Sequence, residues 1–261
     1  MADRNSPVGV FDSGVGGVSV LGQLVRMLPR ERFIYMGDTA HAPYGTKPPE
    51  EVLGYVRGVM DDLIARDVKA VVIACNTATS VAAATLRAEM TLPIIGMEPA
   101  LKPAAMVRRK GLILVLATPM TLCLPKFDAL MARYGEGAVR LPCPGLMELV
   151  EREAFDEAEV YLREHLAAFD LNEVDAIVLG CTHYVFLRPV LQRILPPHVQ
   201  VMDGNEGTAR QLGRVLQQHG LQRLEGEGGV ELHTSGDETV YIPQMQRLLV
   251  MSDALLSQMD K

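Results

Sequence analysis

The chain alternates short, almost entirely apolar segments with longer segments in which apolar residues recur every three or four positions. The short segments predict buried strands at residues 8–11, 33–36, 70–74, 94–96, 112–116, 176–180 and 199–202. The longer segments predict helices at residues 50–65, 78–90, 158–168 and 208–219. Because strands that alternate with helices form βαβ units, we expect an α/β fold in which mostly parallel sheets are flanked by helices.

Two segments of the chain resemble each other. VKAVVIACNT at residues 68–77 matches VDAIVLGCTH at residues 174–183, with the same Val, Ala, Val and Cys and similar apolar residues at three other positions. The same offset of 106 residues (181 minus 75) carries Asp12 onto Thr118, and both follow a predicted strand. This repeat predicts two pseudo-symmetric α/β domains, residues 1–97 plus about 208–261 and residues 98–207. We expect their strand ends to face a common interdomain cleft that holds the active site.

Composition and charge restrict the function. The 261 residues are 48% apolar, yet no apolar run approaches the roughly 20 residues of a membrane helix, which predicts a soluble protein with a sizeable core and no membrane partner. The N-terminus reaches a predicted strand almost at once, without a charged leader and an apolar segment, so we expect a cytoplasmic location. A net charge of −7 without a basic block argues against nucleic acid as a partner.

Four cysteines are scattered along the chain, and two of them end predicted strands. No C-x-x-C pair links Cys75, Cys123, Cys143 and Cys181, so we expect neither a disulfide framework nor a metal site. A helix that begins directly after Cys75 or Cys181 would direct its unpaired N–H groups and the positive end of its dipole at the sulfur, which favours the thiolate. Cys123 and Cys143 are interpreted as ordinary core or surface residues.

The alternative for a cysteine that ends an apolar strand is a small, inert core side chain, which is the commoner fate of a buried thiol. Here, however, polar pairs follow both cysteines, Asn76-Thr77 in the first half and Thr182-His183 in the second. Core packing gives no reason for such pairs at both places, whereas hydrogen bonding to a ligand does. We therefore favour a functional site at both strand ends.

Polar residues also follow the first predicted strand. Asp12 and Ser13 open a glycine-rich turn, in which the simplest interpretation is that one of them caps the next helix. The glycines of this turn do not have the G-x-G-x-x-G spacing, so no dinucleotide site is predicted.

A further stretch, rich in Gly and Pro, contains Asp38, His41 and Tyr44. It is interpreted either as an ordinary surface loop or as a loop that folds over the cleft. The repeat places Glu148 and Glu151 near its counterpart in the second half, where the alternative is a pair of carboxylates on a solvated helix face.

Taken in order, six motifs of the chain resemble the cofactor-independent glutamate racemases, within the wider aspartate/glutamate racemase superfamily. The motifs are VFDSGVGG, YMGDTAHAPYG, IACNTAT, LATPMT, PCPGLMELVE and LGCTHY, in a match that covers about residues 8–220. The resemblance implies two pseudo-symmetric α/β domains, a homodimer and no cofactor. It also implies conversion of L-glutamate into the D-glutamate of bacterial peptidoglycan, and with it a role in cell-wall formation and cell shape.

The resemblance further implies roles for individual residues. Cys75 is similar to the base that acts on the D-enantiomer, and Cys181 is similar to the base that acts on the L-enantiomer. Asp12 resembles the acid group beside the first cysteine, while Glu151 and His183 resemble the groups that assist the second. The residues that resemble substrate contacts are Asp12, Ser13, Tyr44, Gly45, Asn76, Thr77, Thr118, Thr182 and His183. The sequence departs from the family pattern at Met120, Leu124 and Gly204. We expect these departures to affect the shape of the pocket rather than the reaction.

Two thiols suit the inversion of an α-carbon, because one proton leaves one face while another arrives on the opposite face. An ordinary thiol pKa of about 8.5 is near enough to neutral for one sulfur to begin as thiolate and the other as thiol. No motif lysine is placed to suggest pyridoxal phosphate. Two alternatives stay open. One is another enzyme of the superfamily, such as an aspartate racemase, and the other is a non-catalytic two-lobe ligand-binding protein, which would tolerate loss of either thiol.

Overall fold

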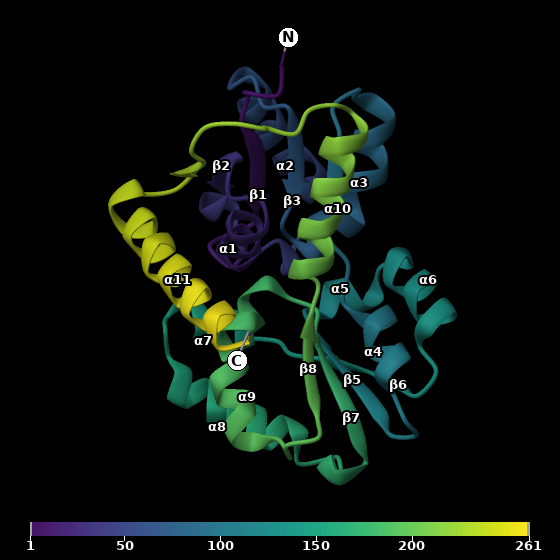
Figure 1. The fold of residues 1–261 in the computed structure, drawn as a ribbon. Coiled ribbons are helices and arrows are strands. Elements are labelled where there is room, and N and C mark those ends of the chain that lie inside the picture. The colour runs from purple at the N-terminus through teal and green to yellow at the C-terminus, as the bar shows by residue number, and fades with distance from the viewer. Residues whose placement is uncertain (1, 260–261) are drawn as a thin grey trace. The chain divides into compact units, whose positions relative to one another are not determined.

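The computed structural model describes residues 2–259 of the chain. Contacts divide the chain into two compact units, Met1–Met97 with Asn205–Lys261 (unit 1) and Glu98–Gly204 (unit 2). Each unit is built around a parallel sheet flanked by helices (Figure 1), which confirms the predicted fold class.

The described part of unit 1 contains a five-stranded sheet in the order β4-β3-β1-β2-β9. Its strands are β1 (Val8–Asp12), β2 (Arg32–Gly37), β3 (Ala70–Ile73), β4 (Ile94–Gly96) and β9 (Gly229–Thr234). Its helices are α1 (Val18–Met27), η1 (Thr39–His41), η2 (Tyr44–Thr46), α2 (Pro49–Ala65), α3 (Asn76–Glu89), α10 (Asn205–Gln218) and α11 (Glu238–Met259), of which η1 and η2 are short 3₁₀ helices. Helices α10 and α11 pack against α1 on one face of this sheet, whereas α2 and α3 cover the other (Figure 1).

Unit 2 contains a four-stranded sheet, within the described residues, in the order β6-β5-β7-β8. Its strands are β5 (Leu112–Ala117), β6 (Ala138–Pro142), β7 (Val174–Leu179) and β8 (Gln200–Asp203). Its helices are α4 (Leu101–Val107), α5 (Pro119–Cys123), α6 (Pro125–Tyr134), α7 (Leu146–Glu151), α8 (Phe155–Leu166), η3 (Leu171–Glu173), η4 (Thr182–Leu187) and α9 (Arg188–Ile194), with η3 and η4 in the 3₁₀ form.

The repeat seen in the sequence is also a repeat of topology. The offset of 106 residues (181 minus 75) carries β1, β2, β3 and β4 onto β5, β6, β7 and β8 in turn. The order β4-β3-β1-β2 of unit 1 therefore becomes β8-β7-β5-β6, which is the order of unit 2. Strand β9 and helix α11 have no counterpart in unit 2 and extend unit 1 at the β2 edge. The two units are thus pseudo-symmetric, as predicted.

The apolar pattern of the sequence did not predict strands β6 and β9, and both lie at the edge of a sheet. Their side chains are mostly half-buried or exposed, in contrast to the fully buried β1 and β3. An edge strand with one solvated side carries polar residues, as AVRLP and GVELHT do, and so lacks the apolar run by which interior strands were recognised.

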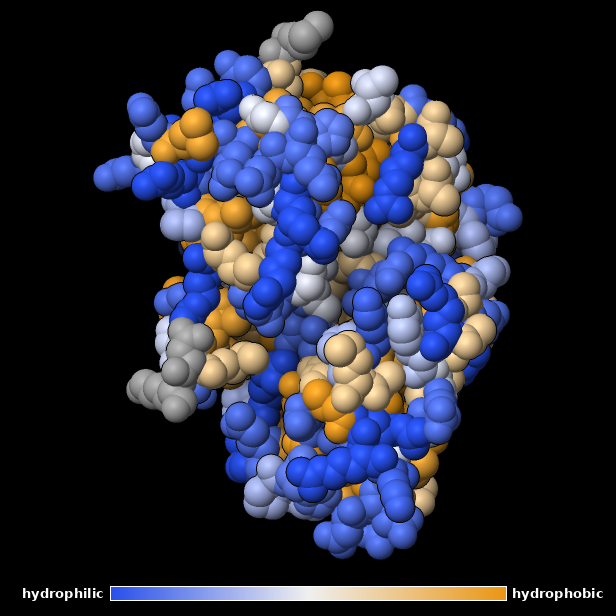
Figure 2. Space-filling model, turned by 45° about the vertical axis from the view of Figure 1, so that its right-hand side comes forward, coloured by the Kyte–Doolittle hydropathy of each residue, from blue (hydrophilic) through white to orange (hydrophobic). Residues whose placement is uncertain are grey.

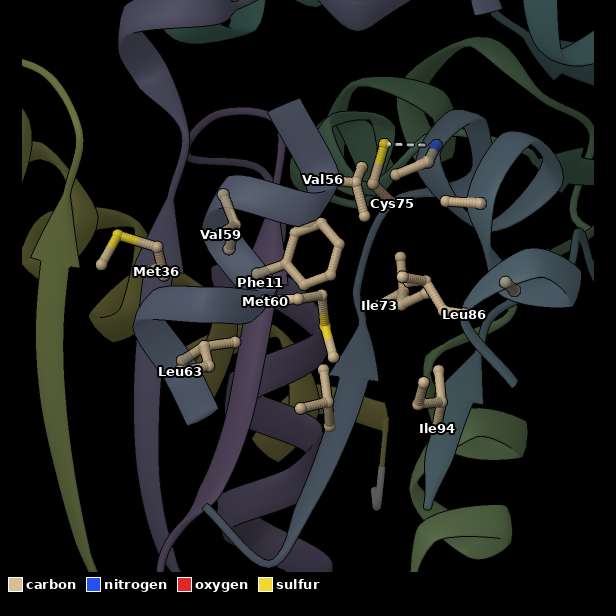
Figure 3. Packing of buried hydrophobic residues seen from close by; sticks show 14 of the residues in the cluster. Phe11, Met36, Val56, Val59, Met60, Leu63, Ile73, Cys75, Leu86 and Ile94 are labelled. Carbon is tan, nitrogen blue, oxygen red and sulfur yellow. Dashed lines mark hydrogen bonds between the residues drawn. The ribbon is translucent and has the colours of Figure 1, made fainter. Parts of the chain in front are cut away.

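The core between the unit 1 sheet and helices α2 and α3 leads up to the candidate site. Phe11 and Ile73 project from β1 and β3 into this cluster, where they meet Val56 and Met60 of α2 (Figure 3). Cys75 belongs to the same cluster and lies at its edge, two residues beyond the end of β3 (Figure 3). The packed core thus fixes the position of the sulfur.

Within residues 2–259, no helix is long and apolar enough to span a membrane. Hydrophilic side chains cover much of the face seen in Figure 2, with apolar side chains scattered between them.

Candidate active site

Strand ends bring the candidate residues of unit 1 to one edge of its sheet. Asp12 ends β1, Asp38 directly follows β2 and Cys75 follows β3. These strands are parallel neighbours, so their carboxyl ends meet, and the backbone N–H of Asp38 donates to the carbonyl of Asp12 at 2.9 Å. This is the edge at which α/β sheets bind ligands.

Cys75 is held at the N-terminus of α3. The helix begins at Asn76, directly after the cysteine, as expected, and the Cys75 Sγ accepts a hydrogen bond from the backbone N–H of Ala78 at 3.4 Å (Figure 3). The Ser13 hydroxyl lies 3.6 Å from the same sulfur, and Cys75 is 7% exposed. Donors of this kind, together with the helix dipole, stabilise a sulfur that carries negative charge.

The Asp12 carboxylate is fully buried next to this helix edge. Its Oδ2 accepts the backbone N–H of Gly17 at 2.8 Å, although α1 itself begins without a side-chain cap. Gly17 must be small here, because a Cβ at this position would lie 2.6 Å from the Asp12 Cβ and 3.1 Å from the Ala74 Cβ. The glycine-rich turn therefore lets the backbone close over the buried carboxylate.

The Gly- and Pro-rich stretch after β2 packs into the same region. Tyr44 is buried, and its hydroxyl donates to the Asp38 Oδ2 at 2.5 Å. Burial raises the pKa of Tyr44 first of all, and the hydrogen bond to Asp38 and the negative charges of Asp38, Cys75 and Asp12 raise it further. Tyr44 therefore keeps its proton and lies within electrostatic range of Cys75. The next residue, Gly45, lies in the same short helix η2. Because Asp38 and Tyr44 are both buried, this stretch is more than an ordinary surface loop.

Asn76 and Thr77 open α3 beside the sulfur, and each is 4% exposed. Neither the nitrogen nor the oxygen of the Asn76 amide has a hydrogen-bond partner within residues 2–259. A buried amide that makes no hydrogen bond is costly, by about 1–3 kcal/mol for each unsatisfied group. The Asn76 side chain is therefore a candidate contact for a polar ligand.

In unit 2, Cys181 occupies the position equivalent to Cys75 but has different neighbours. A 3₁₀ helix, Thr182–Leu187, follows it, and no backbone N–H of this helix bonds to the sulfur. The prediction of a helix-capping sulfur is therefore wrong for Cys181. Its Sγ lies instead 3.7 Å from the Nδ1 of His183, so that a side chain takes the place of the helix N–H.

His183 connects Cys181 to a carboxylate. The His183 ring is 2% exposed, and its Nε2 lies 3.0 Å from the Oε1 of Glu151, the last residue of α7. Burial lowers the pKa of His183, but the hydrogen bonds and charges of Cys181 and Glu151 outweigh burial and raise that pKa well above its ordinary value. The imidazole is therefore protonated near neutral pH, between two groups that can carry negative charge.

The other predicted residues of unit 2 lie at the same sheet edge. Thr118 caps α5, where its hydroxyl accepts the backbone N–H of Thr121 at 3.3 Å and donates to the Thr121 hydroxyl at 3.0 Å. Thr182 is 3% exposed beside Cys181. Glu148, by contrast, is exposed, so the alternative of a solvated carboxylate applies to it but not to Glu151.

The structure thus groups the predicted residues by unit. Unit 1 carries Asp12, Ser13, Tyr44, Gly45, Cys75, Asn76 and Thr77, and unit 2 carries Thr118, Glu151, Cys181, Thr182 and His183. The sequence motifs did not include Ser235, which donates a hydrogen bond to Asp38 at 2.6 Å. Ser235 follows the missed edge strand β9, so no local pattern connects it to the site.

Cys143 and Cys123 take no part in either group. Cys143 is 2% exposed; burial and the charge of Cys181 raise its pKa to about 12, and its thiol donates to the carbonyl of Leu141 at 3.3 Å. Cys123 is exposed. Both agree with their interpretation as ordinary core and surface residues.

Reaction with iodoacetamide should separate these two thiols. A thiolate is the reactive form, so Cys123 should be alkylated first and Cys143 only after unfolding, since its raised pKa keeps it protonated at pH values near 8. Peptide mass spectrometry over time, with and without denaturant, measures the order. Alkylation of Cys143 in the folded protein at the rate of Cys123 would contradict the assigned burial and pKa.

Within the described chain, no cluster of three or more His, Cys, Asp or Glu side chains has the arrangement to hold a metal ion.

Known proteins resemble this chain over most of its length. The family described as Asp/Glu/Hydantoin racemase matches residues 8–212. A glutamate racemase of Bifidobacterium animalis subsp. lactis (strain AD011) is 48% identical, in an alignment that covers 88% of this chain and 93% of the relative. The matched residues therefore come from both unit 1 and unit 2.

Solved structures give the same result. Glutamate racemase from Thermus thermophilus, in complex with β-chloro-D-alanine, is 37% identical and superposes with a TM-score of 0.81 over 94% of each chain. Glutamate racemase from Francisella tularensis subsp. tularensis SCHU S4, in complex with D-glutamate, is 26% identical, with a TM-score of 0.81 over 95% of this chain and 94% of that one. The chain therefore belongs to the Asp/Glu/Hydantoin racemase family, among the glutamate racemases.

Proposed function

We propose that this protein interconverts L-glutamate and D-glutamate by moving a proton at the α-carbon between two cysteines. The observation that carries this proposal is the matched pair Cys75 and Cys181, each just past the carboxyl end of equivalent strands β3 and β7. Each sulfur has its own polar neighbours, Ser13 and an N–H group at one and His183 at the other. The glutamate racemase relatives support the choice of glutamate.

In this proposal the substrate binds with one sulfur on each face of its α-carbon. The proposal also divides the chain into two domains. One comprises residues 1–97 together with about 208–261, and the other comprises residues 98–207. Two opposed bases suit the reaction, because inversion needs one proton removed from one face of the α-carbon and another delivered to the opposite face.

The proton balance is symmetrical. When D-glutamate is bound, the Cys75 thiolate takes the α-proton, the electron pair of the C–H bond moves onto the α-carbon, and the Cys181 thiol delivers its proton to the other face. The product is L-glutamate, with Cys75 as thiol and Cys181 as thiolate. The reverse reaction begins from that state, so no external acid, base or oxidant is needed.

Each half of the site stabilises its own thiolate by a different device. At Cys75 the N–H of Ala78 donates to the sulfur, and the Ser13 hydroxyl lies within hydrogen-bonding distance of it. At Cys181 the protonated His183, which is itself held by Glu151, supplies a positive charge. Asp12, buried near Cys75, is proposed to act on the substrate ammonium or as an acid group on the same side.

The remaining residues hold the substrate and its developing carbanion. The unsatisfied amide of Asn76 offers a donor and an acceptor, and Ser13, Thr77, Thr118 and Thr182 offer hydroxyls and backbone N–H groups. Tyr44 and Gly45 contribute from the turn η2. Oriented dipoles of this kind are worth most in a site from which water is excluded.

The wider biology follows from the resemblance to the family. We propose that the reaction needs no cofactor, that the enzyme works in the cytoplasm as a homodimer, and that its D-glutamate serves peptidoglycan synthesis and thereby cell shape. An aspartate racemase and a non-catalytic ligand-binding protein are the two alternatives. The relatives favour glutamate over aspartate, and two thiols with separate polar partners favour catalysis over simple binding.

The direct test is the loss of optical activity from pure L-glutamate or D-glutamate incubated with the purified protein alone. We expect the circular dichroism signal of either enantiomer to decay to zero without added cofactor. Aspartate is the matched control substrate and should react with a kcat/KM at least about 100-fold lower, the size of discrimination that side-chain contacts can supply. A signal that does not decay, or comparable rates with aspartate, would contradict the proposal.

A further inference from the structure

A chain of hydrogen bonds reaches Tyr44 from a part of the sequence far from the motifs. Asp38 is 2% exposed, and its Oδ2 accepts the Tyr44 hydroxyl at 2.5 Å. Its Oδ1 accepts the hydroxyl of Ser235 at 2.6 Å and lies 2.8 Å from the Nδ1 of His41. Ser235 comes 197 positions after Asp38, so the C-terminal part of unit 1 ties down the loop that carries Tyr44.

The directions of these protons are fixed. The Ser235 oxygen accepts the backbone N–H of Ala40 at 3.1 Å, which leaves its own proton to be donated to Asp38. The raised pKa of Tyr44 keeps its hydroxyl protonated, and this hydroxyl donates to the Asp38 carboxylate. Both hydroxyls therefore point at Asp38, so the carboxylate is the common acceptor that joins β9 to the Tyr44 loop.

The turn after β9 is fitted closely to this loop. The N–H of Ser235 donates to the carbonyl of Gly37 at 3.0 Å, and the hydroxyls of Thr39 and Thr234 lie 2.6 Å apart. At Gly236 a Cβ would fall 2.4 Å from the Thr39 Oγ1, so this turn has no room for a side chain there. Strand β9 thus serves as a rigid support for the loop, in addition to extending the sheet.

We propose that Asp38 and Ser235 are positioning residues that act on the substrate through Tyr44. This inference rests on the proposed function, in which Tyr44 and Gly45 contact glutamate. The Tyr44 ring belongs to the same buried cluster as Cys75, and its hydroxyl donates a hydrogen bond to Asp38. The hydrogen bonds from β9 therefore set where the turn Tyr44–Thr46 meets the substrate.

The expected kinetic effect is on binding. Tyr44 and Gly45 hold a part of glutamate that does not react, and a contact of equal strength in the ground state and the transition state changes KM but not kcat. Ser235→Ala should raise KM for both enantiomers about 3- to 10-fold, less than the full value of a hydrogen bond to a charged group because Ser235 acts on the substrate only through Tyr44, with kcat within about 2-fold of wild type. Asp38→Asn, which removes the charged acceptor, should raise KM at least about 10-fold.

Matched variants separate positioning from general damage. Ser235 is exposed, so its replacement leaves no buried cavity. Ser235→Thr keeps the hydroxyl and should restore a wild-type KM. Ser6→Ala removes another serine hydroxyl of unit 1 that donates to a carboxylate, that of Asp67 at 3.2 Å, and should leave KM unchanged.

The decisive comparison uses Tyr44→Phe, which keeps the ring but ends the link to Asp38. If Ser235 acts through Tyr44, Ser235→Ala should change KM by less than about 2-fold in the Tyr44→Phe background, because the two effects are coupled. The calorimetric Kd for racemic glutamate is measured in parallel, since it does not depend on turnover. An equal effect of Ser235→Ala in both backgrounds, or an unchanged KM and Kd in Ser235→Ala alone, would overturn the inference, whereas a wild-type protein that fails to racemise glutamate would overturn the proposed function.

Discussion

Replacement of either Cys75 or Cys181 by serine is expected to slow racemisation by about 10³- to 10⁴-fold in both directions while leaving glutamate binding within a few-fold of wild type. A serine hydroxyl is of similar size, but it is hardly ionised near neutral pH, so it neither takes the α-proton nor replaces a thiol as donor. Loss of one general base or acid typically costs about 10²- to 10⁴-fold, and the expected decrease here lies at the upper end of that range. The exposed Cys123 gives the control, because Cys123→Ser makes the same chemical change away from the site.

Racemisation rates alone do not show which sulfur serves which face. Enantiomers have equal free energies in water, so kcat/KM for the two directions must be equal in the wild type and in every variant. An irreversible reaction at the same α-carbon removes this constraint. In 3-chloroglutamate, removal of the α-proton expels chloride from the β-carbon, and the resulting enamine tautomerises and hydrolyses to 2-oxoglutarate and ammonium. This reaction needs only one base.

The two serine variants should therefore show opposite preferences. Cys75→Ser should retain elimination from the L-enantiomer through Cys181, and Cys181→Ser should retain elimination from the D-enantiomer through Cys75. A dehydrogenase-coupled assay for 2-oxoglutarate measures both. Elimination from the same enantiomer by both variants, or racemisation by either at the wild-type rate, would show that the cysteines are not assigned one to each face.

The interior of the fold was predictable because of how it is buried. Strands β1, β3, β5 and β7 lie between layers of helices, so their sequences are nearly continuous runs of apolar residues. The repeated run that ends in Cys75 and Cys181 also revealed the repeat of topology. Helix α3 begins two residues earlier than predicted, at Asn76, because the polar Asn76 and Thr77 in its first turn break the apolar periodicity there.

What escaped prediction depends on contacts between distant residues. The equivalent positions Lys69 and Asp175 show this at the other end of the two sheets: Lys69 pairs with the buried Glu31 at 2.5 Å, whereas Asp175 accepts backbone N–H groups at residues 109–111. Neither partner is visible in a local pattern. The same is true of Ser235, whose link to Asp38 exists only because β9 pairs with β2.

The two sulfurs also differ in a way that their matched sequences conceal. Both follow an apolar strand and precede two polar residues, yet Cys75 accepts the N–H of Ala78 and Cys181 does not accept a helix N–H. The 3₁₀ helix after Cys181 leaves room for the His183 ring beside the sulfur. The choice between an α and a 3₁₀ helix over six residues is not visible in the sequence, because intrinsic propensity is a weak guide that tertiary packing often overrides.

This difference predicts that His183→Gln will damage only one of the two half-reactions. Elimination from L-3-chloroglutamate, which depends on Cys181, should fall about 10²-fold, while elimination from the D-enantiomer through Cys75 should stay within a few-fold of wild type. Glu151→Gln should act in the same direction, because the Glu151 carboxylate holds the His183 ring and supports its charge. Equal loss in both half-reactions, for either variant, would mean that these residues do not belong to the Cys181 side alone.

The raised pKa of His183 makes the same assignment testable through stability. A group whose pKa is higher in the folded than in the unfolded state stabilises the fold fully below its unfolded pKa, about 6.5 for histidine, and this contribution is lost as the pH rises through the folded pKa. Hydrogen bonds to Cys181 and Glu151 raise the folded pKa of His183 despite its burial. The free energy of unfolding of the wild type should therefore exceed that of His183→Gln most at about pH 6 and progressively less toward about pH 9, as measured by urea titration. A difference that does not change with pH would show that the pKa of His183 is the same in the folded and unfolded states, and a difference that grows with pH would show that burial keeps the ring neutral. In either case the thiolate of Cys181 would lack the positive partner assigned to it.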